Sequence, residues 1–87
     1  MVKYTIAFKR EAIKELKSIP AKNARKIGTA ITELAENPRP TGCKKLVGKQ
    51  DNFWRIRIGD YRVIYVIDEE IRIVNIRKVG HRKDIYE

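Results

Sequence analysis

The chain has few of the side chains that carry covalent or metal chemistry: one cysteine, one histidine and 11 acidic residues among 87. Its single cysteine, Cys43, cannot form a disulfide within the chain, which favours a reducing, cytoplasmic location. No histidine lies near Cys43 in the sequence, so its thiol is better interpreted as a small apolar side chain than as a nucleophile. The carboxylates are scattered, and no glycine-rich loop precedes a helix. We therefore expect neither a metal site nor a cofactor.

Long apolar segments are also absent. No run is long enough to span a membrane and the chain does not start with a signal-peptide pattern, so we expect no membrane association. No linker or repeat divides the 87 residues, which suffice for one small domain over residues 1–87. Positive charge is in excess, with 20 Lys and Arg against 11 Asp and Glu and a net charge of +9. This excess favours a polyanionic partner, either nucleic acid or an acidic protein segment, although charge also serves solubility.

The spacing of apolar residues predicts an α+β fold. Alternation predicts a strand over residues 2–7, and from Phe8 the apolar residues recur at helical spacing until Pro20. A second helical pattern runs from Ala24 to the Asn37-Pro38 pair. Alternating segments then predict strands over residues 43–47, 52–58, 61–68 and 71–78. We expect an N-terminal strand, then an antiparallel two-helix hairpin packed on one face of a mostly antiparallel sheet of four to five strands.

The expected turns place several arginines opposite one another. A two-residue loop at Gly59-Asp60 would put Arg57 opposite Arg62, and a similar loop at Glu69-Glu70 would put Arg62 opposite Arg77. Facing like charges disfavour folding by a few tenths of a kcal/mol, roughly, so the arrangement makes sense when an anion sits between them. This predicts a basic wall on one face of the sheet, flanked by Arg55 and Asn75. The opposite, helix-covered face would carry Trp54, Ile56, Val63, Tyr65, Val74 and Ile76.

Such a basic wall suits cleavage of RNA, because RNA carries its own nucleophile in the 2′-hydroxyl. The protein then needs a group that takes the 2′ proton, a group that protonates the leaving 5′ oxygen, and cations for the charge on phosphorus. Histidine titrates near neutrality, so His81 is the favoured base. Tyr86 is a candidate acid or a platform for base stacking. Arg57, Arg62 and Arg82 would hold the phosphate through bidentate contacts.

A second set of basic residues would contact the RNA backbone without sequence preference: Lys44, Lys45, Lys49, Arg55 and Arg77. Simpler interpretations exist for both sets. A single histidine near a chain end is often a surface residue, a terminal tyrosine can simply pack, and strand arginines can be solvated. The helix residues Glu11, Lys14 and Glu15 are interpreted as a solvated helix face.

Several motifs together resemble one known family. They are Tyr4-x-Ile-x-Phe8, Asn37-Pro38, Lys45-Leu46-x-Gly48, the segment of residues 54–65 and the segment of residues 79–86. In order and spacing they resemble, nearly end to end, the RelE/ParE superfamily of toxins from type II toxin–antitoxin systems, and within it the RelE branch. The resemblance implies a β-α-α-β-β-β domain, an mRNA interferase that cleaves mRNA in the ribosomal A site beside 16S rRNA and inhibits translation. It also implies a RelB-like antitoxin that blocks the activity.

The resemblance also implies roles for individual residues. Arg62 matches a family arginine that holds the scissile phosphate, Arg82 matches another arginine beside the reaction, and Tyr86 matches a C-terminal tyrosine. Arg55 and Arg57 match positions that are lysines in the best-known member. Because arginine stays charged, a general base is not expected at these two positions, whereas charge stabilisation is.

Two other functions stay open at this point. A ParE-like protein that inhibits DNA gyrase without catalysis would share the scaffold, although such proteins generally lack this set of arginine, histidine and tyrosine. A non-catalytic RNA-binding module would use the same basic face without cleavage. Loss of cleavage on mutation of His81 or Arg62, with folding retained, would distinguish an enzyme from both.

Overall fold

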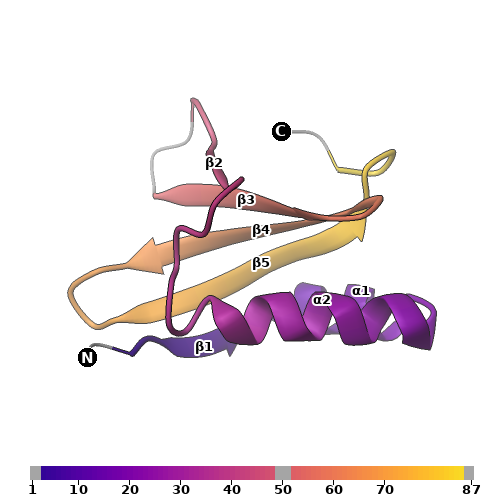
Figure 1. Ribbon diagram of the computed structural model, residues 1–87, viewed down its shortest axis with the longest axis horizontal. Coiled ribbons are helices and arrows are strands. Elements are labelled where there is room, and N and C mark those ends of the chain that lie inside the picture. Colours follow the sequence, from indigo (N-terminus) through magenta and orange to yellow (C-terminus); the bar gives the residue numbers. More distant parts are fainter. Residues whose placement is uncertain (1–2, 49–51, 86–87) are drawn as a thin grey trace.

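The computed structural model describes residues 3–48 and 52–85, which form a five-stranded sheet and two helices (Figure 1). The strand order is β1-β5-β4-β3-β2, with β1 parallel to β5 and the other neighbours antiparallel. The predicted α+β fold is confirmed. Along the chain, the elements are β1 (Thr5–Phe8), α1 (Arg10–Lys17), α2 (Ala21–Glu33), β2 (Lys44–Lys45), β3 (Phe53–Ile58), β4 (Tyr61–Asp68) and β5 (Ile73–His81).

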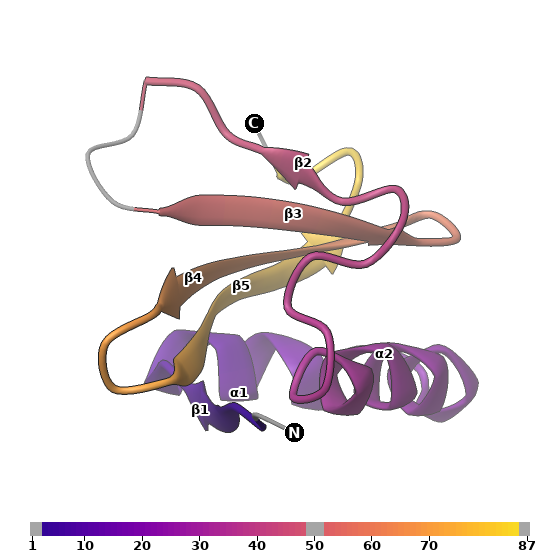
Figure 2. The ribbon, with the colours of Figure 1, turned by 60° about the vertical axis from the view of Figure 1, so that its left-hand side comes forward.

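Both helices pack on the same face of the sheet (Figure 2). The apolar stripe of α1 buries Ala12, and that of α2 buries Ile27 and Ile31. Each fully buried aliphatic side chain contributes about 1.5–3 kcal/mol, so this cluster is the main source of stability. No helix in the described part of the chain is long and apolar enough to cross a membrane. The sheet contributes Ile56, Val63, Tyr65, Ile67, Val74, Ile76 and Val79 to the same core, with Trp54 packed against it, as predicted for the helix-covered face.

Element boundaries differ from the predicted ones at strand ends and in α2, which spans Ala21–Glu33 and so ends before the Asn37-Pro38 pair. β1 begins at Thr5 and not at residue 2, and residues 1–2 lie outside the described part. The strand predicted over residues 43–47 is reduced to Lys44–Lys45. The chain turns directly after α2. In that turn, the carbonyl of Ala35 accepts the N–H of Tyr4, from the N-terminal segment, at 2.8 Å. That bond fastens the end of the helical layer to the start of β1.

The predicted register of the β3–β4 hairpin is confirmed. Ile58 pairs with Tyr61, and Arg57 pairs with Arg62. The turn between these strands contains Gly59 at φ +59°, a backbone conformation that favours glycine. The two arginines therefore face each other directly on the side of the sheet away from the helices.

The predicted register between β4 and β5 is wrong. Asp68 pairs with Ile73, so the loop between the strands contains four residues and not two. The Asp68 Oδ1 stabilises this longer loop by accepting the N–H groups of Glu70 at 3.1 Å and Ile71 at 3.2 Å. A bulge between Ile64 and Tyr65 in the pairing then adds a further shift.

The two shifts together change the partner of Arg62. Arg62 pairs with Gly80, and Arg77 falls in the bulge. The predicted row of three arginines across three strands is therefore not formed.

The face away from the helices is not the bare basic wall that the sequence suggested. Leu46, Ile64 and Ile85 form a small buried cluster there, with Phe53 packed against it. The segment after β5 folds back over this face, so that Ile85 is only 6% exposed. A Cβ at Gly80 would lie 3.2 Å from two Ile85 carbons, so glycine at that position permits the close approach.

Two tyrosine hydroxyls hold loops to the sheet in different environments. Tyr65 is fully buried, and its hydroxyl donates to the Pro38 carbonyl at 2.7 Å. Burial raises the pKa of Tyr65 well above its ordinary value, so the group stays a donor. At the surface, the Tyr4 hydroxyl donates to the Glu69 Oε1 at 2.5 Å, and this bond raises the pKa of Tyr4 and lowers the pKa of Glu69.

We expect Tyr65→Phe to lower the free energy of unfolding by about 1–2 kcal/mol, because the Pro38 carbonyl loses its donor in a buried site. Tyr4→Phe is the matched control and should cost less, because Glu69 remains solvated and paired with Arg39. Urea unfolding of both variants beside the wild type measures the difference. Equal losses would show that burial does not strengthen the Tyr65 bond.

Candidate active site

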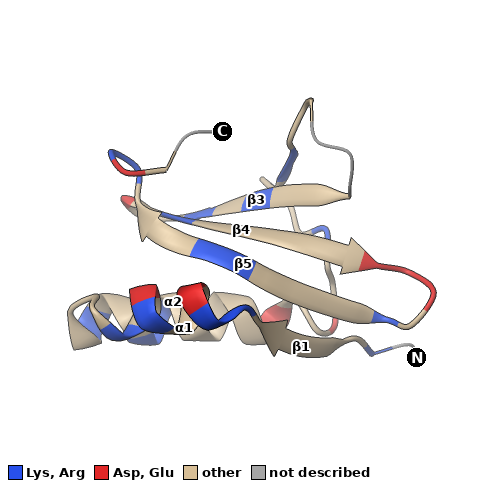
Figure 3. Cartoon of the chain, turned by 180° about the vertical axis from the view of Figure 1, so that it is seen from behind, with Lys and Arg blue, Asp and Glu red and all other residues tan. Residues whose placement is uncertain are grey.

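The described candidate catalytic residues come from the β3–β4 hairpin and from the end of β5 (Figure 3). Arg57 is exposed, whereas Arg62 is half-buried. The Arg62 Nη1 donates to the carbonyl of Gly59 at 3.1 Å and to that of Tyr61 at 3.0 Å. Backbone carbonyls of the turn therefore hold the Arg62 guanidinium at the hairpin end, and Arg57 occupies the position paired with Arg62 on β3.

Arg82 reaches the same hairpin end from the other side of β4. Its backbone N–H donates to the Asp60 carbonyl at 2.7 Å, and its Nε lies 3.8 Å from the Asp60 Oδ1. The two contacts bring Arg82 beside the turn that carries Arg57 and Arg62. Three of the five residues predicted to be catalytic thus gather around one turn, where an anion would lower their mutual repulsion.

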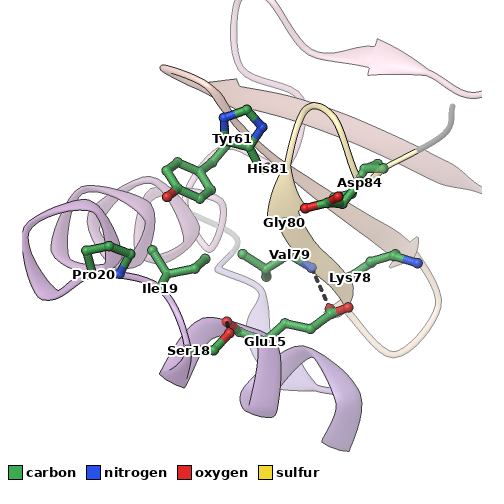
Figure 4. Close-up of a pocket in the computed structure, with 11 residues that line it drawn as sticks. Glu15, Ser18, Ile19, Pro20, Tyr61, Lys78, Val79, Gly80, His81 and Asp84 are labelled. Carbon is green, nitrogen blue, oxygen red and sulfur yellow. Dashed lines mark hydrogen bonds between the residues drawn. The ribbon is translucent and has the colours of Figure 1, made fainter.

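His81 lies on the opposite face of the sheet from Arg62. It pairs with Tyr61, and the two rings meet edge to face with centroids 5.6 Å apart. Both line a cavity of about 310 Å³ between the end of α1 and the end of β5 (Figure 4). The predicted convergence of histidine and arginines on one wall is therefore wrong. His81 is the last residue of β5, and the next residue, Arg82, bonds to the turn that carries the arginine cluster.

The hydrogen bond of His81 bears on its predicted role. The His81 Nδ1 accepts the backbone N–H of Lys83 at 3.1 Å, so the neutral ring carries its proton on Nε2. In this tautomer Nε2 donates a hydrogen bond, and the acceptor nitrogen is already occupied. The neutral ring in this geometry has no unoccupied nitrogen for the base role favoured from the sequence, and an acid role would need a second proton on Nδ1 in place of the Lys83 bond.

The residues predicted to contact the RNA backbone do not form one surface. Lys44 is exposed and pairs with Arg55, but Arg55 is only 3% exposed and so does not present its side chain to a large ligand. The Arg77 guanidinium lies 5.6 Å from the centroid of the Phe53 ring, on the face away from the helices. Lys44 and Arg77 are therefore the members of this set that the structure leaves on the basic face.

Lys45 points to the other side of the sheet, with its Nζ 6.0 Å from the centroid of the Trp54 ring. The Arg39 guanidinium carbon lies 5.0 Å from the centroid of the same ring, so both cations contact Trp54 on the helix-covered side of the sheet. The remaining predicted residues, Lys49 and Tyr86, lie outside the described residues.

Glu15, beside the site, differs from its predicted role. It is not part of a solvated helix face, because its Oε1 accepts the backbone N–H of Val79 in β5 at 2.9 Å. The helical spacing of apolar residues does not indicate this contact, because the contact depends on where the pairing of β5 with β1 ends. Ile85, an apolar residue among charged ones, did give a signal of burial that the sequence interpretation passed over.

A small α+β domain with two helices on one face of a five-stranded sheet is the class of fold that this chain shares with known toxins. The chain matches the family model described as the ParE toxin of type II toxin–antitoxin system, parDE, over residues 6–86, and it belongs to that family. The resemblance found in the sequence is thereby confirmed.

Individual relatives carry RelE-type names. The chain is 35% identical to the RelE1 protein of Methanocaldococcus jannaschii, with 99% of this chain and 98% of the relative covered. It is 34% identical to toxin RelG of Mycobacterium tuberculosis, with 95% of each covered. The RelE–RelB complex of Pyrococcus horikoshii matches with a TM-score of 0.82 and 29% identity, over 98% of this chain and 100% of that chain. The protein is a RelE-family toxin of a type II toxin–antitoxin system.

Proposed function

We propose that this toxin is an endoribonuclease that cleaves mRNA on the ribosome and so stops translation. The observation that carries the proposal is the direct pairing of Arg57 with Arg62, with Arg82 tied to the intervening turn through Asp60. Arginines at directly paired positions bring like charges together, and a phosphodiester in its transition state is an anion that such a group of guanidiniums can stabilise.

The reaction needs no nucleophile from the protein. The 2′ oxygen of the RNA bonds to phosphorus, the bond from phosphorus to the 5′ oxygen breaks, and the products are a 2′,3′-cyclic phosphate and a 5′-hydroxyl. Arg57, Arg62 and Arg82 would stabilise the extra negative charge on phosphorus. As the 2′-hydroxyl gives its proton to a base, His81 in its doubly protonated form would give the Nε2 proton to the leaving 5′ oxygen, which requires Nδ1 to release the Lys83 N–H. Tyr86 stays a candidate for the remaining proton transfer or for stacking on a base.

One observation favours a second function. The matching family model is described by the name ParE, and a ParE-like protein would inhibit DNA gyrase without cleaving RNA. The relatives named RelE1 and RelG support the RNA-directed function instead. An assay of RNA cleavage beside an assay of gyrase supercoiling separates the two.

We also propose that an antitoxin with acidic, amphipathic segments neutralises this toxin. Two solved relatives, from Pyrococcus horikoshii and Mycobacterium tuberculosis, are complexes of a toxin with its antitoxin. A chain with a net charge of +9 suits an acidic partner. Inhibition would follow from covering the arginines or from displacing the segment that carries Arg82. Ile85 anchors that segment in a cluster of three buried residues, more firmly than the sequence suggested but far less than the main core.

Cleavage should persist in an excess of chelator, once ribosome integrity is controlled for, because RNA supplies the nucleophile and arginines supply the positive charge. In a cell-free translation reaction, primer extension should locate the cuts within translated mRNA. End analysis should find 5′-hydroxyls opposite a 2′,3′-cyclic phosphate or its 3′-phosphate product. Fragments with 5′-phosphates would point to metal-activated water and overturn the proposed chemistry.

Arg62→Ala should lower the rate of cleavage by about 10²–10³, because it removes a donor held in place for the transition-state charge. Arg25→Ala, on the exposed side of α2, is the matched control and should leave the rate unchanged. Rates in the cell-free reaction, with circular dichroism to verify folding, measure both. A well-folded Arg62→Ala protein that still arrests growth fully would place the reaction elsewhere.

The antitoxin should be recovered by co-expression with the reading frame next to the gene for this toxin. Its ordered segments should bury about 1,000–3,000 Å², because ordering a flexible segment opposes association and must be offset by contact area. Co-purification and relief of growth arrest are the two measurements. A neighbouring product that neither binds nor relieves arrest removes this model.

A further inference from the structure

Among residues 3–48 and 52–85, no strand pairs with the C-terminal half of β5 on the side that faces away from β4. β1 accompanies β5 only as far as the pair of Phe8 with Ile76, after which the N–H of Lys9 donates to the Ile76 carbonyl at 2.8 Å. β5 continues to His81 with β4 as its neighbour on the other side. The unsupported stretch is the one that delivers His81 and Arg82 to the hairpin end.

The register tells where the backbone groups of this stretch point. The N–H of Arg82 bonds to the Asp60 carbonyl, so this position is a hydrogen-bonded pair of the antiparallel ladder. Hydrogen-bonded and non-hydrogen-bonded pairs alternate, so Val79 and His81 direct their N–H and C=O groups away from β4. The His81 carbonyl accepts the N–H of Asp84 at 2.8 Å.

The N–H of Val79 instead finds a partner in the helical layer. It donates to the Glu15 Oε1 at 2.9 Å, and Figure 4 shows the Glu15 side chain reaching from α1 to the Val79 nitrogen. A carboxylate that accepts a backbone N–H makes a charge-assisted bond, roughly twice as strong as a neutral one. Glu15 thus takes the place of the strand that β1 does not extend to provide.

We propose that Glu15 is a positioning residue that fixes the C-terminal half of β5 and thereby places His81 and Arg82 for RNA cleavage. The catalytic part of this inference rests on the proposed function. His81 lies two residues beyond the tethered N–H, and Gly80, between them, adds no side chain of its own to hold the backbone. A shift of about 1 Å in a catalytic group can lower a rate about 10²-fold, so even a small release of β5 should be visible.

The test compares substitutions at two glutamates of the same helix. Glu15→Leu keeps the size of the side chain and removes the acceptor, whereas Glu15→Gln keeps an acceptor oxygen. Glu11→Leu is the matched control, because the Glu11 side chain is 73% exposed and contacts only Lys9, at 3.6 Å, among the described ion pairs. Glu15→Ala is a second acceptor-free variant for use if Glu15→Leu lowers the folded fraction.

In the cell-free reaction, the acceptor-free variants should lower kcat about 10- to 100-fold and leave KM within about twofold, because the hairpin arginines that would hold the ground-state phosphate keep their positions while His81 and Arg82 shift. Glu15→Gln should keep activity within about threefold of wild type, and Glu11→Leu should match wild type. In a double-mutant cycle, the effect of removing Glu15 should be smaller in the Arg82→Ala background, because the part of the effect that acts through Arg82 is already lost and only the part through His81 remains.

Amide hydrogen exchange decides the structural part without reference to activity. Exchange at Val79 should be faster in the acceptor-free variants and close to wild type in Glu15→Gln. Unchanged exchange at Val79 would overturn the inference, and so would a Glu15→Gln protein as impaired as Glu15→Leu. A loss of kcat that merely follows the folded fraction, or full additivity with Arg82→Ala, would also overturn it. A wild-type toxin that does not cleave RNA would instead remove the proposed function, and the exchange data would still decide whether Glu15 holds β5.

Discussion

The register of β5 against β4 determines which charged groups meet at the end of the sheet. The four-residue loop held by Asp68, together with the bulge at Ile64 and Tyr65, moves β5 so that Arg62 faces Gly80. With a glycine at that point, the following segment can fold back over the sheet and bury Ile85. The same register brings the N–H of Arg82 to the Asp60 carbonyl. A shift of two residues in this one pairing would separate Arg82 from the hairpin that carries Arg57 and Arg62.

The arginine cluster opposes the stability of the fold that presents it. Arg57 and Arg62 carry like charges at directly paired positions, and Arg82 adds a third positive charge beside Asp60 at the same hairpin end. The main core can bear this cost, because it lies on the other face of the sheet and contains no charged side chain. Separation of the two faces lets the protein keep unfavourable charges where an anion can bind, at a small cost relative to a core of eleven buried residues.

Local patterns predicted the parts of the fold that depend on local physics. Helical spacing identified the buried side of both helices, and the Gly59-Asp60 pair identified the register of the β3–β4 hairpin, hence the facing of Arg57 and Arg62. The β4–β5 register was not predictable in the same way, because Glu69-Glu70 gives no strong signal for loop length and a bulge has little signature in sequence. The error placed Arg77 in the site and His81 on the wrong face. Glu15 was missed for a different reason, since its partner is a backbone group whose availability depends on tertiary structure.

The helical layer and the sheet both contribute to the geometry of the candidate site, because Glu15 of α1 bonds to the strand that carries His81. Arg57 and Arg62 are fixed by an intact antiparallel hairpin, whereas His81 and Arg82 lie on a strand end with one strand neighbour. Positions of the second kind depend on individual bonds, here those of Glu15 and Asp60, and individual bonds open at a lower free-energy cost than a sheet does. Under the proposed mechanism, an inhibitor of this toxin would need to move only His81 and Arg82, because the two hairpin arginines that remained in place would lack the proposed proton donor and the third cation.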